Sequence, residues 1–103
     1  MTNLKLLTAA CVSFTVALAA GSASAYSGEN LAPKAKVSLV QARAIALKAF
    51  PGKITDEELE TEGGGSGLRW SFDIRHGKVT QEVGVDAKTG VVLENAKEGA
   101  NPD

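Results

Sequence analysis

The segment from Leu68 to Arg75 alternates strictly between apolar and polar side chains. Its apolar members are Leu68, Trp70, Phe72 and Ile74, and its polar members are Arg69, Ser71, Asp73 and Arg75. A period of two is typical of a β-strand with one buried and one exposed face. Since a single strand is not stable alone, the neighbouring segments have to pair with its edges and cover its apolar face.

Two turn signals follow this strand and place further apolar residues opposite it. A two-residue turn at His76-Gly77 predicts a hairpin whose register is set by the turn. The predicted pairs are Ile74–Val79, Phe72–Gln81, Trp70–Val83 and Leu68–Val85. The segment Asp86–Gly90 predicts a second turn, with the pairs Val85–Val91 and Val83–Leu93. Both hairpins put apolar side chains on the same face, so a continuous apolar surface is expected.

A helix is predicted before the strands. Ser38 and Gln41 have the spacing of a capping box, and Pro51-Gly52 ends the pattern after Phe50. At 100° per residue one face of this segment is apolar. Its members are Leu39, Ala42, Ile45, Ala46, Ala49 and Phe50. Small alanine side chains on this face would let the helix lie close to the layer that it covers.

The segment Lys53–Glu62 predicts an acidic strand between the helix and the alternating segment. Ile54 and Leu59 have opposite parity, so that either a bulge intervenes or the strand starts late. The run Gly63–Gly67 predicts a flexible connection. The expected fold class is therefore α+β, with one N-terminal amphipathic helix packed on one face of an antiparallel meander of three to four strands.

The first 25 residues have the pattern of a secretory signal peptide. Lys5 precedes an uncharged apolar run, and Ala23-Ser24-Ala25 supplies the small residues of a cleavage site, which predicts cleavage after Ala25. The expected divisions are a signal peptide at 1–25, a flexible leader at 26–37, a folded domain at 38–95 and a disordered tail at 96–103. A periplasmic or secreted protein without a permanent membrane anchor is expected.

The composition excludes several classes of function. Without Lys5 and the rest of the signal peptide, 10 basic and 12 acidic residues remain, which argues against nucleic-acid binding. The one cysteine, Cys11, lies in the signal peptide, so neither a disulfide nor a cysteine-based zinc site is expected. The one histidine, His76, falls in a predicted turn without an orienting carboxylate. No catalytic residues and no cofactor are therefore expected, and the protein is predicted not to be an enzyme.

The polar face of the predicted sheet is the candidate binding surface. Its candidate partner-binding residues are Glu58, Glu60, Glu62, Arg69, Asp73 and Arg75. In a strand the glutamates point in a row about 6.6 Å apart and do not converge as calcium ligands do, so no metal site is expected. The alternative is a small-ligand or metal-binding envelope protein that uses this acidic strand. Self-association through a sheet edge is a further alternative.

The chain from Val37 to Asn95 resembles the PepSY domain. The resemblance rests on the ordered segments Ser38–Phe50, Pro51–Ile54, Glu58–Glu60, Trp70–Ile74 and Glu82–Leu93, of which the last contains V-D-A-K-T-G. It implies a relation to propeptides of thermolysin-like metallopeptidases and to stand-alone regulators of peptidases outside the cytoplasm. It carries over no catalytic or binding residues. The expected function is an exported protein-binding module that regulates or inhibits a peptidase in trans.

Overall fold

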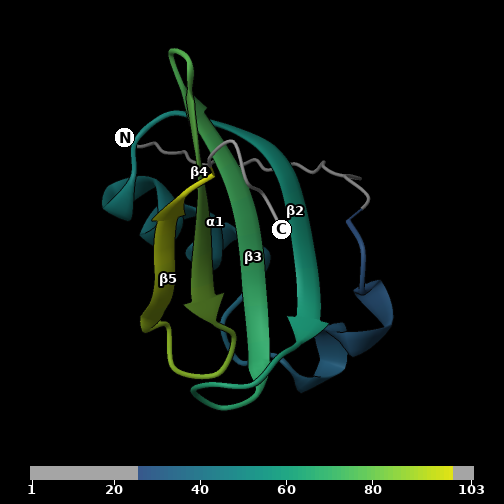
Figure 1. The fold of residues 1–103 in the computed structure, drawn as a ribbon. Helices are drawn as coiled ribbons and strands as arrows, with labels where there is room; N and C mark the ends of the chain where they lie inside the picture. Colours follow the sequence, from purple (N-terminus) through teal and green to yellow (C-terminus); the bar gives the residue numbers. More distant parts are fainter. Residues whose placement is uncertain (1–25, 99–103) are drawn as a thin grey trace, which may run out of the picture.

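The computed structural model describes residues 26–98. These residues form a 3-10 helix, η3 (Glu29–Lys34), one α-helix, α1 (Leu39–Ala49), and the strands β2 (Lys53–Thr61), β3 (Leu68–His76), β4 (Val79–Asp86) and β5 (Val92–Lys97). The four strands form one antiparallel sheet in the order β2-β3-β4-β5, and α1 packs against one of its faces (Figure 1). The predicted α+β class is confirmed.

The helix begins and ends where the sequence predicts. Ser38 Oγ accepts a hydrogen bond from the Gln41 N–H at 3.1 Å, and the Ser38 N–H donates to Gln41 Oε1 at 2.9 Å, which completes the capping box. The helix stops before Pro51. Ala42 and Ala46 are completely buried against the sheet, so the small side chains do bring the helix close to it.

The apolar side chains of β3 form the centre of the core. Trp70, Phe72 and Ile74 are at most 2% exposed, and Val83 and Val85 of β4 are completely buried beside them. The Trp70 indole N–H donates to the Val37 carbonyl at 2.8 Å, which satisfies its polar atom. The prediction that Trp70 belongs to the core is confirmed.

The register of the first hairpin differs from the prediction by two residues. The turn is Gly77-Lys78, and His76 pairs with Val79. Trp70 therefore lies opposite Val85 and Phe72 lies opposite Val83. A shift of two residues leaves every side chain on its predicted face, which is why the apolar pattern could not distinguish the two registers.

The second hairpin also differs, through an irregularity between Gly84 and Val85. Val85 pairs with Val92 and Val83 pairs with Asn95, so the predicted pairs with Val91 and Leu93 are wrong. Val91 is 55% exposed and Val92 is 39% exposed. The last strand therefore adds less apolar surface than the sequence indicated.

The acidic strand β2 contains the bulge that was one of the two predicted alternatives. Ile54 pairs with Ile74 and Asp56 pairs with Asp73, so Thr55 is the extra residue. From Asp56 to Thr61 the pairing with β3 is regular. Leu59 consequently faces the core at 2% exposure, while Glu58 and Glu60 point to the other face.

The segments flanking the predicted domain also contribute to the fold. Residues 26–37, expected to be a flexible leader, contain η3, and the Tyr26 ring contacts the Trp70 ring at 5.2 Å between centroids. At the other end β5 runs to Lys97, and the Glu98 N–H donates to the Thr80 carbonyl at 2.8 Å. The predicted signal peptide, its cleavage after Ala25 and the end of the predicted tail lie outside the described residues.

A buried carboxylate joins two of the loops. Asp86 is 2% exposed and accepts hydrogen bonds from the N–H and Oγ of Ser66 and from the N–H groups of Lys88 and Thr89, at 2.7–3.2 Å. Burial alone would raise the pKa of Asp86, but these hydrogen bonds outweigh it and lower the pKa to about 2. A Cβ on Gly65 would lie 2.3 Å from Asp86 Oδ2, so the glycine run leaves room for this contact.

Replacing Ala46 tests the close packing of α1. We expect Ala46→Leu to lower the free energy of unfolding by about 1–3 kcal/mol, because the larger side chain has no space against the sheet. Ala44→Leu is the matched control, since Ala44 is exposed on the same helix, and its effect should stay within about 0.5 kcal/mol. Urea denaturation measures both, and equal effects would contradict close packing.

Replacing Asp86 tests the carboxylate that joins the loops. We expect Asp86→Asn to lower the free energy of unfolding at neutral pH by about 1–3 kcal/mol. The NH2 group of Asn replaces one carboxylate oxygen, and unlike that oxygen it cannot accept hydrogen bonds. Ser66→Ala removes a single side-chain donor and should cost less. If Asp86→Asn unfolded at the same urea concentration as the unmodified chain, the proposed role of Asp86 would be wrong.

Candidate functional site: the acidic face of the sheet

The sheet face opposite α1 collects the candidate binding residues. We call it the open face, and its charged members are Lys53, Asp56, Glu58, Glu60, Glu62, Arg69, Asp73, Arg75, Glu82, Glu94 and Glu98. The strand registers place these side chains in rows that cross the sheet. Eight of the eleven carry carboxylates, so the net charge of this face is negative.

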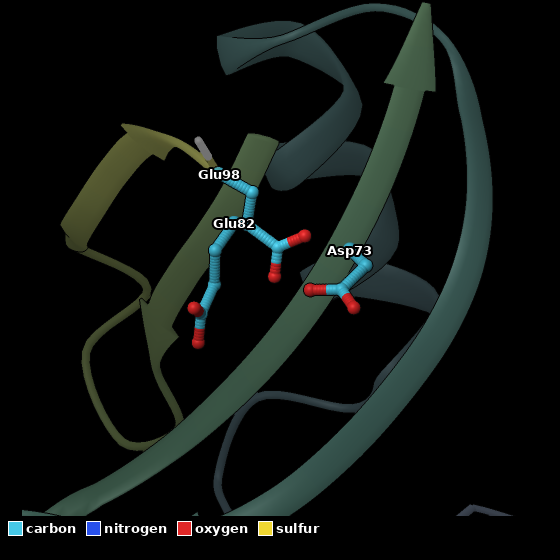
Figure 2. A group of neighbouring side chains, drawn as sticks. All are labelled: Asp73, Glu82 and Glu98. Carbon is cyan, nitrogen blue, oxygen red and sulfur yellow. The ribbon is translucent and has the colours of Figure 1, made fainter. Parts of the chain in front are cut away.

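The central row places like charges directly opposite one another. Asp73 of β3 pairs with Asp56 of β2 on one side and with Glu82 of β4 on the other. Glu98, directly after β5, joins them, so that one carboxylate oxygen each of Asp73, Glu82 and Glu98 lies within 4.8 Å of the others (Figure 2). Like charges at this spacing destabilise a sheet.

Two carboxyl groups on the open face have raised pKa values, for which burial is the largest cause and the neighbouring carboxyl groups add to it. The pKa of Asp73 is raised to about 6, first by burial and then by the charges of Glu98 and Glu82. The pKa of Glu60 is raised to about 7 by burial, by a hydrogen bond with the Glu62 side chain and by the charge of Glu58. Both carboxyl groups therefore hold protons more tightly than they would in water.

Arg69 is the one candidate residue that is almost completely buried. It is 7% exposed, and its guanidinium donates to the Gly63 carbonyl at 3.0 Å and lies 3.2 Å from Glu94 and 3.5 Å from Glu62. Gly84 leaves room for it, because a Cβ there would lie 2.8 Å from Arg69 Cδ. Arg69 thus ties the β2–β3 loop to β5 and is largely shielded from solvent, and whether it contacts a partner stays a prediction.

The remaining predicted residues do gather on the open face. Glu58 and Glu60 stand on β2, Asp73 lies in the central row, and Glu62 follows the end of β2. Arg75 is exposed at the end of β3, where its Nε donates to the Gly77 carbonyl at 3.1 Å. Whether these residues bind a partner stays a prediction.

Sequence reasoning missed part of this surface. Glu98 falls in the predicted disordered tail, and Glu94 lies outside the predicted set of binding residues. Glu94 pairs with Gly84 and so faces the same side as Arg69. The period of two along β5 predicts the face of Glu94 only if the position of the bulge is known, and the sequence does not mark that position.

The open face suits the binding of positive charge more than chemistry on a substrate. Ser71 Oγ donates to Glu82 at 3.0 Å, and Ser71 is 5% exposed, so this hydroxyl is held within the sheet. His76 is exposed at the end of β3, with its ring 6.2 Å from the Phe50 ring. The three clustered carboxylates each bring one oxygen to within 4.8 Å of the others, and three converging oxygens are fewer than the six to eight that calcium takes.

The chain belongs to the PepSY family, described as the peptidase propeptide and YPEB domain, which matches residues 36–95. This match covers more than half of the chain and confirms the resemblance seen in the sequence. The family consists of propeptide and regulatory domains, not catalytic ones, and is linked to peptidase regulation and typically found outside the cytoplasm. No curated protein and no solved structure matches the chain. Among the residues that the structure describes, no helix is long and apolar enough to cross a membrane.

The raised pKa values predict an unusual dependence of stability on pH. Because Asp73 and Glu60 have higher pKa values in the folded than in the unfolded chain, folding takes up protons between about pH 4 and 7. The melting temperature should therefore rise by a few degrees as the pH falls from about 8 to about 5. Below about pH 4 it should fall again, because Asp86 has a lowered pKa and becomes protonated.

Neutralising Asp73 identifies the source of this effect. We expect Asp73→Asn to raise the melting temperature at pH 8 and to flatten the profile between pH 8 and 5. Glu29→Gln is the control, because Glu29 lies on η3 away from the open face and its loss should leave the profile unchanged. Calorimetry from pH 2 to 8 gives the measurement. A melting temperature that rises steadily with pH over this range would contradict the repulsion on the open face.

Proposed function

We propose that the protein is an exported, non-enzymatic protein-binding module that regulates an extracytoplasmic peptidase in trans through its open face. The carrying observation is the row of opposed carboxylates at Asp56, Asp73 and Glu82 on the uncovered face of a PepSY domain. The family supports the link to peptidases, and the pattern of residues 1–25 supports export to the periplasm or beyond.

The charge on the open face supports a basic partner surface. Repulsion between carboxylates lowers the stability of the free protein, and a basic surface would relieve it by supplying counter-charges. The same charge would speed encounter with a positively charged partner and would weaken binding as the salt concentration rises. Glu58, Glu60, Glu62, Asp73 and Arg75 are the proposed contact residues, together with Glu82 and Glu98.

Arg69 has a supporting role in this proposal. Its contacts fix the positions of two carboxylates of the open face, Glu62 after the end of β2 and Glu94 on β5. Because the guanidinium is covered by these groups, it would contact a partner only if they moved. We therefore remove Arg69 from the set of direct contacts and retain it as a positioning residue.

The alternative of a metal-binding protein that uses the acidic strand has less support. Glu58 and Glu60 lie two residues apart along β2 and follow the strand in a row, as the sequence predicted. Their carboxylates are therefore not arranged around a common centre as ligands of a hard cation are. Calorimetric titration with calcium, zinc and copper tests this alternative directly.

A charge reversal on the open face tests the proposed function. The tagged chain would be used to capture proteins from an envelope extract, and a captured peptidase would be assayed with increasing amounts of the chain. We expect Glu82→Lys to weaken both capture and the effect on the peptidase by about fivefold or more, because it opposes a basic partner. Both interactions should also weaken as the salt concentration rises.

Glu29→Lys is the matched control for this experiment. It makes the same change in net charge on η3, away from the open face, and should leave capture and peptidase activity nearly unchanged. Equal losses in the two variants would mean that net charge alone governs binding. A peptidase that is captured but whose activity does not change would leave a binding module without the proposed regulation.

A further inference from the structure

The outer edge of β2 opens onto a hollow. β2 is the first strand of the sheet, so β3 pairs with only one of its edges. The residues Ile54–Glu57 line a hollow of about 620 Å³ together with Tyr26, Ser27 and Arg43. This volume lies in the range that bound ligands occupy in proteins. The hollow therefore follows the edge of β2 that β3 leaves unpaired.

The neighbouring part of this edge already pairs with extended chain. Ser27 forms an isolated parallel bridge with Glu58, and the Leu59 N–H donates to the Ser27 carbonyl at 2.8 Å. Because backbone groups of alternate residues point to the same edge, the backbone of Glu57 faces the hollow as well. After Ser27 the chain enters η3, which packs against β2. The edge thus continues from a pairing site into the hollow.

The two sides of the hollow differ in chemistry. On the side of α1, Arg43 donates twice to Glu57, at 2.6 and 2.8 Å, so these two charges neutralise each other. The partly buried side chains of Ile54 and Tyr26 add apolar surface. On the side of the open face stands the exposed carboxylate of Asp56, with Glu58 two residues further along the strand and the exposed ammonium group of Lys53 at its start. One side is therefore neutral and partly apolar, and the other carries two carboxylates and one ammonium group.

We propose that the Lys53–Glu57 edge of β2 binds an extended peptide segment of a partner protein as an additional strand. The segment carries basic residues at alternate positions and small or apolar residues between them. Side chains of a strand alternate in direction, so the basic residues would lie on the side of Asp56 and the others on the side of Ile54 and Tyr26. Backbone hydrogen bonds would supply affinity, and this alternation would supply specificity.

The inference rests on the proposed function as a protein-binding module and names the chemistry of the partner segment. Acidic side chains along a sheet edge normally discourage pairing with other strands. At this edge they would exclude acidic and purely apolar strands while favouring basic ones. The edge and the open face share the carboxylates of Asp56 and Glu58, so one partner would be able to contact both.

Nuclear magnetic resonance titration of the isotope-labelled chain tests the proposal. The probe is a short synthetic peptide in which Lys and Val alternate, and the comparison peptide alternates Glu and Val. We expect the Lys/Val peptide to shift the amide signals of Ser27 and of residues 54–59, with saturation below about 1 mM. The Glu/Val peptide should shift none of them.

Two charge reversals locate the bound peptide. Asp56→Lys should weaken binding of the Lys/Val peptide by at least about fivefold, because the exposed Asp56 carboxylate stands at the hollow. Glu98→Lys makes the same change in charge in the cluster with Asp73 and Glu82 instead of at the hollow, and should leave binding within about twofold. If Asp56→Lys does not fold, Asp56→Asn replaces it and should give a smaller loss in the same direction.

Three results would overturn the edge proposal. The first is the absence of a saturable shift with the Lys/Val peptide. The second is a set of shifts centred on Asp73, Glu82 and Glu98 together with a loss of binding in Glu98→Lys, which would support the proposed function but place the peptide on the open face. The third is a concentration-dependent shift of residues 54–59 without peptide, which would assign the edge to a second copy of this chain.

Discussion

A single helix covers a four-stranded sheet, and this constraint determines which side chains of the described residues are apolar and buried and which are polar and face outward. α1 can cover only one face, so every strand has to be apolar on that side and polar on the other. β3 meets this requirement most strictly, with Trp70 and Phe72 in the core and Ser71 and Asp73 on the open face. The uncovered face is then available to carry charge, and in this chain most of that charge is negative.

Two buried or partly buried carboxyl groups of the same sheet differ in pKa because only one of them is surrounded by hydrogen-bond donors. Asp86 is the more deeply buried, yet its pKa is lowered to about 2, because Ser66, Lys88 and Thr89 all donate to it. Asp73 is less deeply buried, but its pKa is raised to about 6, first by its burial and then by the charges of its neighbours Glu98 and Glu82, because no donor compensates them as the donors around Asp86 do. The first carboxylate stabilises the loops at one end of the sheet, and the second places repulsion on the open face.

The open face and the β2 edge offer two connected ways to recognise a basic partner. The face presents charge without backbone groups, which suits a folded surface, whereas the edge presents backbone groups flanked by charge, which suits an extended segment. Asp56 belongs to both, since it opposes Asp73 on the face and lines the hollow at the edge. The family is associated with peptidase propeptides and regulation, and a peptidase is the partner that we propose for both surfaces.

The sequence alone determined where α1 and the strands β2, β3 and β4 lie and which face each side chain of β3 takes. Three local patterns carried this information: the capping box of Ser38, the alternation around Trp70 and the parity change that marks the bulge in β2. Each lies within one segment, so it can be recognised without knowing which segment packs against it. Only the tertiary structure decided the registers, the burial of Arg69 over Gly84 and the meeting of Glu98 with Asp73. A shift of two residues preserves every face, and the bulge before Val85 has no sequence signal of its own. Which side chains meet across the sheet therefore depends on how the whole chain packs.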